Sequence, residues 1–389
     1  MREQKCAIVG LRGLICVLGV GPLIGVGQVY GAESKDPETA SSKPSASDVL
    51  TGEQWNRVDA TVDRGLAYLA SQQQPDGSVS APRTGQPGIT ALAVMAFLSR
   101  GHTPGEGRYG TQMLAAIDFV LSCQRSDGLL SAAEPESVHV HEGASHTGNY
   151  NHAIAGLMLT EIYGMLSGPR QAQAADAIRR ALQLTRREQV KPRRSAGEQG
   201  GWRYLRPLPS GDADISMSSW QLMFYRSARN AEFDVPKEYV DEALEYIRRG
   251  FDRSQQTFTY NLPGGRNHAT LGVAGGAIVS LALGGEHQTD AARQAGDWVL
   301  SQPFDHYNRG ESPYHYGAYY CSQAMFQLGG EYWRRFYPPL AETLIQHQSS
   351  DGSWEPENDK GGSFGRSYTT SLAVLALTPA YQLLPIFQR

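Results

Sequence analysis

A short turn motif recurs along the chain about every 50 residues, and its clearest copy is QSSDGSW at residues 348–354. Partial copies lie at residues 74–78, 124–128 and 199–202. Within the motif, glycine can adopt a positive φ and aspartate can hydrogen-bond the following backbone, which is typical of a tight turn. Each copy follows an apolar helical stretch, and most precede a second one. The recurrence therefore predicts a repeat fold whose unit is a helix, a turn, a loop and a second helix.

Six such units can be laid out along residues 55–389. First helices, such as residues 239–249, are amphipathic and charged, whereas second helices, such as residues 272–283, are almost entirely apolar or small. A helix with a polar face belongs on the outside, and one without belongs in the interior. We expect an all-α fold, an α6/α6 toroid, with a site where the long loops and the inner-helix N-termini gather. The expected inner helices are residues 89–98, 150–157, 216–228, 269–283, 314–326 and 368–377.

The N-terminus is typical of an export signal. Three basic residues fall within the first twelve positions, an apolar run covers residues 13–29, and small residues favour cleavage before Ala32. Residues 1–31 are therefore predicted to be a signal peptide and residues 32–54 a disordered linker rich in Ser and Pro. The protein is expected to be periplasmic or secreted. An uncleaved membrane anchor remains the alternative, since about 17 apolar residues is near the lower limit for a membrane span.

The composition and net charge argue against one class of partner, nucleic acid. The net charge is -4 and charged residues make up 19% of the chain, so no nucleic-acid partner is expected. Cleavage would leave Cys123 and Cys321, which we expect to be buried free thiols.

Helix pairs joined by Gln-x-x-Asp-Gly-Ser-Trp resemble the repeats of squalene and oxidosqualene cyclases and of protein prenyltransferase β subunits. The resemblance covers nearly all of residues 55–385, with a close match at residues 348–354 and partial matches elsewhere. It implies a single α6/α6 barrel, where triterpene cyclases have two such domains. It also implies that any enzyme activity would be terpene cyclase-like, with an apolar or isoprenoid small molecule as ligand and no cofactor.

Triterpene cyclases protonate an alkene with the central acid of an Asp-x-Asp-Asp-Thr motif, which requires hydrogen-bonding neighbours and a dry cavity. The nearest stretch here is Asp212-Ala213-Asp214-Ile215-Ser216. Its first two acids match, whereas isoleucine and serine replace the third acid and the threonine. The resemblance therefore implies Asp212 or Asp214 as the catalytic acid. Helix capping by these residues is the alternative, because acids before a helix commonly bond free backbone N–H groups.

This sequence lacks the residues that two other activities found among proteins with these repeats require. Protein prenyltransferases hold zinc with Asp, Cys and His, but here tyrosine occupies the acid position before Cys321, and residues 367–369 supply no histidine. The internal thioester of complement-like proteins needs a Gly-Cys-Gly-Glu-Gln segment, and Ala196 takes the place of its cysteine. Protein prenylation and thioester chemistry are therefore not expected.

Four histidines fall close together before and within the second inner helix. We expect His139, His141 and His146, with Glu142, to form a solvated polar loop over the barrel mouth, with no metal bound, although such a set could also complete a metal site. His152 opens an apolar inner helix. We interpret it as a hydrogen-bonding group or general acid/base at the barrel mouth, with core packing as the alternative.

Aromatic residues gather around the acidic pair and at the starts of inner helices. Aromatic faces stabilise cations, so these rings can line a substrate cavity, although they also pack cores. The predicted substrate-binding residues are Trp202, Tyr204, Trp220, Tyr150, Tyr316, Tyr319 and Tyr320.

Two functions remain open. The first is an exported isoprenoid- or lipid-handling enzyme that uses Asp212 or Asp214, assisted by His152. The second is a non-catalytic toroid that binds a ligand or an envelope protein, with peripheral membrane contact left open in either case. The single domain, the incomplete acidic motif and the export signal count against the first.

Overall fold

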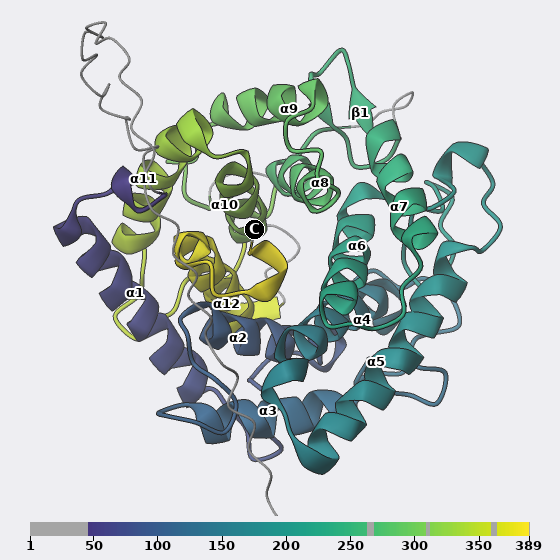
Figure 1. The fold of residues 1–389 in the computed structure, drawn as a ribbon, viewed down its shortest axis with the longest axis horizontal. Coiled ribbons are helices and arrows are strands. Elements are labelled where there is room, and N and C mark those ends of the chain that lie inside the picture. Colours follow the sequence, from purple (N-terminus) through teal and green to yellow (C-terminus); the bar gives the residue numbers. More distant parts are fainter. Residues whose placement is uncertain (1–45, 263–267, 309–311, 359–363, 389) are drawn as a thin grey trace, which may run out of the picture. The chain divides into compact units, whose positions relative to one another are not determined.

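Twelve α-helices alternate between two concentric layers along the described part of the chain (Figure 1). The computed structural model describes residues 46–262, 268–308, 312–358 and 364–388. The predicted signal peptide lies outside the described residues. The first long helix begins at Gly52, before the predicted start of the toroid at residue 55. It begins there because Thr51 and Gln54 form a capping box across its first turn.

The helices alternate strictly between the outer and the inner layer. The outer helices are α1 (Gly52–Ser71), α3 (Gly110–Ser122), α5 (Gly168–Gln189), α7 (Lys237–Arg249), α9 (Asp290–Leu300) and α11 (Gly330–Gln346). The inner helices are α2 (Gly88–Ser99), α4 (Ala144–Ile162), α6 (Ile215–Asn230), α8 (Leu271–Leu283), α10 (Tyr314–Leu328) and α12 (Gly365–Leu377). Each inner helix packs on the next, and α12 packs on α2 to close the ring. The predicted α6/α6 toroid of six helix pairs is therefore confirmed.

Short elements complete the connections. A hairpin of β1 (Phe251–Asp252) and β2 (Thr257–Phe258) follows α7. The 3-10 helices are η1 (Ala46–Val49), η2 (Arg83–Gly85), η3 (Tyr163–Met165), η4 (Ala196–Glu198), η6 (Pro379–Tyr381) and η7 (Pro385–Phe387). No helix in the described ranges is long and apolar enough to cross a membrane.

The two layers follow from the residue pattern. Every residue of α2 is buried, as its apolar and small composition requires. In α7 only one stripe is buried, at Val240, Ala243, Leu244, Tyr246 and Ile247, which is the spacing of a single helical face. The charged residues of α7 lie on the opposite face, so it can only be an outer helix.

The turn motif links neighbouring outer helices. In the clearest copy, Gln348 Nε2 donates to Thr61 O and to Gly352 O, each at 2.9 Å, and thereby joins α11 to α1 and closes the ring. Gly352 has φ +89°, and a Cβ there would lie 2.4 Å from the backbone oxygen of Arg64. The motif glycine thus allows both the turn and the close approach of the next helix.

Three further copies make the same link, but two of their glutamines differ from the sequence interpretation. Gln73 rather than Gln74 bonds across the first turn, from its Nε2 to Gly77 O and Gln112 O. Gln189 rather than Gln199 does so in the third, bonding Gly200 O and Tyr239 O. The third copy was misassigned because an inserted loop separates the glutamine of α5 from its glycine.

Candidate functional site

A cavity of about 350 Å³ opens where the N-termini of the inner helices meet, the end at which a site is expected. All six inner helices contribute to its wall. They supply Gly88, Ile89, Leu92, His146, Thr147, Tyr150, Asn151, Ile154, Ser216, Trp220, Val273, Tyr316 and Tyr368. Loops add Gly85, Tyr260, His268, Thr270, Ser312, Pro313, Glu357 and Phe364. The wall is mainly aliphatic and aromatic, with a few polar groups, which is the usual make-up of a small-molecule site.

Three of the predicted aromatic residues, Tyr150, Tyr316 and Trp220, line this cavity and belong to one hydrogen-bonded chain that includes Ser216. The hydroxyls of Tyr150 and Tyr316 lie 3.1 and 2.7 Å from Ser216 Oγ. Trp220 donates from its indole nitrogen to the Tyr316 hydroxyl oxygen at 3.0 Å. The side chains of Tyr150, Ser216, Tyr316 and Trp220, which we call the hydroxyl cluster, thus join α4, α6 and α10 across one side of the wall.

The other four predicted aromatic residues do not line the cavity. Tyr319 is buried and stacks on Trp220, with ring centroids 5.5 Å apart, and Tyr320 packs edge-on against the same indole. Trp202 is fully buried and donates to Thr185 O at 2.9 Å, as Trp354 does to Leu344 O. Tyrosines behind the wall and motif tryptophans therefore serve packing, which sequence spacing could not separate from lining.

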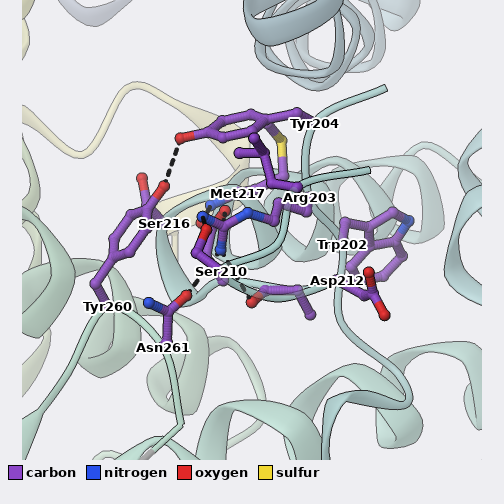
Figure 2. A network of polar contacts seen from close by, with 12 residues as sticks. Trp202, Arg203, Tyr204, Ser210, Asp212, Ser216, Met217, Tyr260 and Asn261 are labelled. Atoms are coloured by element: carbon purple, nitrogen blue, oxygen red, sulfur yellow. Dashed lines mark hydrogen bonds and ion pairs between the residues drawn. The ribbon is translucent and has the colours of Figure 1, made fainter. Parts of the chain in front are cut away.

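Tyr204 belongs to a polar network beside the cavity that centres on Arg203 (Figure 2). The Arg203 guanidinium lies 5.1 Å from the ring centroid of Tyr204 and 5.4 Å from that of Tyr260. It donates to Asn261 Oδ1 at 2.8 Å and to Ser210 Oγ at 3.2 Å, as Figure 2 shows. The two tyrosine hydroxyls bond to each other at 2.7 Å. Tyr260 faces the cavity, so this network supports one part of the wall from behind.

Asp214 is fully buried at the start of α6, beside this network. Its Oδ1 accepts the Met217 N–H at 2.7 Å, which makes it the N-cap, and its Oδ2 lies 3.7 Å from Arg203 Nη1. Burial raises the pKa of Asp214 to about 6, against the opposing effect of the Arg203 charge. The carboxyl therefore both caps a helix and titrates near neutral pH. It does not itself line the cavity, whereas its neighbour Tyr260 does.

Asp212 is held away from the cavity. Its carboxylate accepts from Arg194 Nη2 at 2.6 Å and from the Arg194 backbone N–H at 2.8 Å. The Arg194 hydrogen bond lowers the pKa of Asp212. An ionised, salt-bridged carboxylate is a poor proton donor.

His152 is fully buried and lies toward the outer layer. Its Nδ1 accepts the Leu130 N–H at 3.3 Å, so its Nε2 carries the proton and donates to Thr185 Oγ1 at 3.0 Å. Burial lowers the pKa of His152 to about 4. A neutral imidazole with both nitrogens engaged, outside the cavity wall, matches the core-packing alternative in its placement.

The other histidines differ from the expected solvated loop because His146 belongs to a helix and packs against an aromatic ring. His146 lies in the first turn of α4, where its ring stacks on Tyr204 at 3.9 Å between centroids. His139 and His141 lie 5.2 and 5.1 Å from it, again between ring centroids. Burial lowers the pKa of His146 to about 3. Within the described residues, no group of three His, Cys, Asp or Glu side chains is arranged to hold a metal ion.

Glu357 is a cavity residue that the sequence interpretation missed. It is 4% exposed and accepts the backbone N–H groups of Tyr314, His315 and Tyr316 at 2.8, 2.8 and 3.2 Å. It therefore caps α10 from the loop that precedes α12. No local signal marks it, because the helix that it caps lies in the preceding repeat. Cys321 is buried and Cys123 partly buried, and both are free thiols, as expected.

The fold and the cavity together define an α/α toroid with a largely apolar cavity at one end. No protein-family model matches the chain, and no curated protein does. Solved structures do match. A variant of the type II terpene cyclase MstE from Scytonema, in complex with merosterolic acid A, is 14% identical with a TM-score of 0.57, covering 86% of this chain and 100% of its own. The α-1,6-mannanase GH76A from Salegentibacter sp. HEL1_6 is 14% identical with a TM-score of 0.59, covering 84% and 99%.

A second MstE variant, in complex with geranylgeranyl dihydroxybenzoate, is 14% identical with a TM-score of 0.55 and covers 86% of this chain and 100% of its own. At this identity the likeness shows the fold alone, an α/α toroid. The two kinds of neighbour bind an isoprenoid compound and an oligosaccharide, so the fold alone does not choose a ligand.

Proposed function

We propose that the chain binds an apolar, isoprenoid-like small molecule in the cavity at the N-termini of its inner helices. The observation that carries this proposal is the wall itself, where aliphatic residues such as Ile89, Leu92 and Val273 face aromatic ones. Burying an apolar ligand against such a wall is favourable by about 25 cal/mol per Å² of apolar surface. The resemblance to cyclase repeats and the MstE neighbours support the same ligand class.

Glycoside hydrolysis is less well supported. That chemistry normally needs two carboxyl groups flanking the bond that is cleaved. Among the described residues of the wall, Glu357 is the only carboxylate, and its oxygens are engaged by the backbone of α10.

Cyclase-like acid chemistry is the finer form of the proposal, and Asp214 is its candidate acid. A carboxyl group with a pKa of about 6 retains its proton in part near neutral pH, as a general acid requires. Its neighbour Tyr260 is the group of this network that reaches the cavity wall. Asp212 and His152 lack an open path to the cavity, so their catalytic roles remain predictions that the geometry does not favour.

Export is part of the proposal, on the basis of the basic and apolar N-terminal sequence. In the envelope or outside the cell the protein would meet lipids and other apolar compounds, and peripheral membrane contact would shorten their path to the cavity. An envelope protein as partner is the alternative.

The test is native mass spectrometry with lipid extraction on the protein purified from its own cell envelope. We expect a co-purifying apolar small molecule, and we expect Val273→Trp to lose it, because Val273 is 2% exposed and lines the cavity. Val190→Trp is the matched control, since Val190 is 55% exposed. Retention of a partner polypeptide with no small molecule would contradict the proposal and favour a binding scaffold.

A further inference from the structure

We propose that the hydroxyl cluster donates one hydrogen bond to the ligand, so that the ligand is a neutral apolar molecule that carries an oxygen acceptor. This inference rests on the proposed function and names the chemical class of its ligand.

The proposal follows from a count of hydrogens. Three hydroxyl groups, of Tyr150, Ser216 and Tyr316, are joined by two hydrogen bonds, of 3.1 and 2.7 Å, that meet at Ser216 Oγ. Each bond uses one hydroxyl hydrogen, whichever of its two oxygens donates. The bond from Trp220 to Tyr316 uses the indole hydrogen and accepts none in return. Two of three hydroxyl hydrogens are therefore used, and one is left without an acceptor in the cluster.

An acceptor for the remaining hydrogen can come from the ligand space. All four residues of the hydroxyl cluster line the same cavity. A cavity hydroxyl that loses its contact with water when a ligand covers it is unfavourable without a new acceptor, so a ligand oxygen at this point is bound in preference to a hydrocarbon surface. The rest of the wall is largely apolar, which leaves the body of the ligand free of polar requirements.

Among the described residues, the wall beside the cluster offers an anionic oxygen no cationic partner. Glu357 lines the cavity, and the described part of its wall contains no lysine or arginine. Asp214 is two positions from Ser216, and its charge adds to the burial that raises the pKa of Tyr150 and of Tyr316. Without a cationic partner in the wall, a phosphate or carboxylate would lose its hydration uncompensated, whereas an ether, a carbonyl or an alcohol would not.

The experiment compares three probes on the full chain by isothermal titration: farnesene, farnesyl methyl ether and farnesyl phosphate. The ether accepts a hydrogen bond and cannot donate one. We expect it to bind about tenfold or more tightly than farnesene, with the phosphate weaker than the ether. In the triple variant Tyr150→Phe/Ser216→Ala/Tyr316→Phe, the ether and farnesene should bind equally, with farnesene binding retained.

Tyr225→Phe is the matched control. It removes a buried hydroxyl from the same helix, α6, that bonds Gln189 Oε1 at 3.1 Å and does not line the cavity. The control should keep the preference for the ether. If the triple variant fails to fold, the ratio in the unmodified chain still decides.

Equal binding of ether and farnesene, a preference that survives in the triple variant, or tightest binding of the phosphate would each overturn the inference while leaving apolar binding in place. Absence of binding by all three probes would instead contradict the proposed function together with this inference.

Discussion

Arg203 and Asp214 form a buried ion pair in which the arginine has several partners and the carboxylate few. Their side chains are 7% and 0% exposed. Removing one partner of such a pair leaves the other charge uncompensated, which typically costs about 3–5 kcal/mol. We expect Arg203→Met to lower the free energy of unfolding by about 3 kcal/mol at pH 7. The loss should be smaller at pH 5, because Asp214, with its pKa near 6, is then largely protonated.

Urea denaturation at the two pH values measures this difference. Arg57→Met is the control, since the Arg57–Glu342 bridge is 45% and 42% exposed and such a solvent-screened pair contributes little to stability. An equal loss at pH 5 and pH 7 for Arg203→Met would show that the arginine acts through its other hydrogen bonds and not through Asp214.

The residues at the candidate site show which contacts can be predicted from a local sequence pattern and which cannot. Asp214 was predicted because it lies in an acidic motif before an inner helix, and Trp220 because it flanks that acidic pair. Tyr150 and Tyr316 were predicted because they lie at the starts of inner helices. Glu357 was missed, and Trp202 was assigned to the cavity although it is a motif tryptophan. Both errors concern contacts between repeats, which depend on tertiary packing rather than on local pattern.

At the scale of elements, the turn motif holds one outer helix against the next. Gly352 has a φ of +89°, and a Cβ at this position would lie only 2.4 Å from a backbone oxygen of α1. Gly285 has a similar φ of +81° but nothing within 4 Å. We expect Gly285→Ala to cost about 1 kcal/mol for its backbone conformation alone. Gly352→Ala should cost about 2 kcal/mol more, because α1 and α11 must also move apart.

Urea denaturation of the two alanine variants separates the cost of the backbone conformation from the cost of moving α1 and α11 apart. Similar losses for both would mean that ring closure does not depend on the motif turn. The helices themselves were predictable, since their apolar and amphipathic patterns are local. Their links were less predictable: Gln189 was overlooked because it lies far from its glycine in sequence, and Gln73 because it directly precedes the similar Gln74.

At the scale of the molecule, the cavity occupies one end of the ring and the C-terminal segment the other. η7 packs against α6, and Gln327, at the end of α10, donates to Phe387 O at 3.3 Å. Figure 1 shows the C-terminus near the centre of the ring. The toroid follows from the repeats, but this closing segment does not, because it has no counterpart in any unit and its residues bear no motif.

Glu161 fastens this segment and makes the stability of the whole fold depend on pH. Its Oε2 accepts the Ile386 N–H at 3.1 Å, and its Oε1 accepts the Ser227 hydroxyl. Burial raises the pKa of Glu161 from its ordinary value of 4.5 to about 7. Between these values the folded state holds a proton that the unfolded state has released, so stability falls as pH rises from 4.5 to 7. The full effect is at most about 3 kcal/mol.

Asp214 has the same sign over the window from its ordinary 3.8 to about 6, so both residues favour the folded state at mildly acidic pH. Glu161→Gln keeps an acceptor for Ile386 and removes the titration. We therefore expect its melting temperature to change less between pH 5 and pH 8 than that of the unmodified chain. Glu342→Gln is the control, because Arg57 lowers the pKa of this exposed carboxylate, which gives a small effect of opposite sign. Since Glu161 joins α4, α6 and the C-terminal segment, an unchanged pH profile in Glu161→Gln would mean that this end of the ring opens before global unfolding.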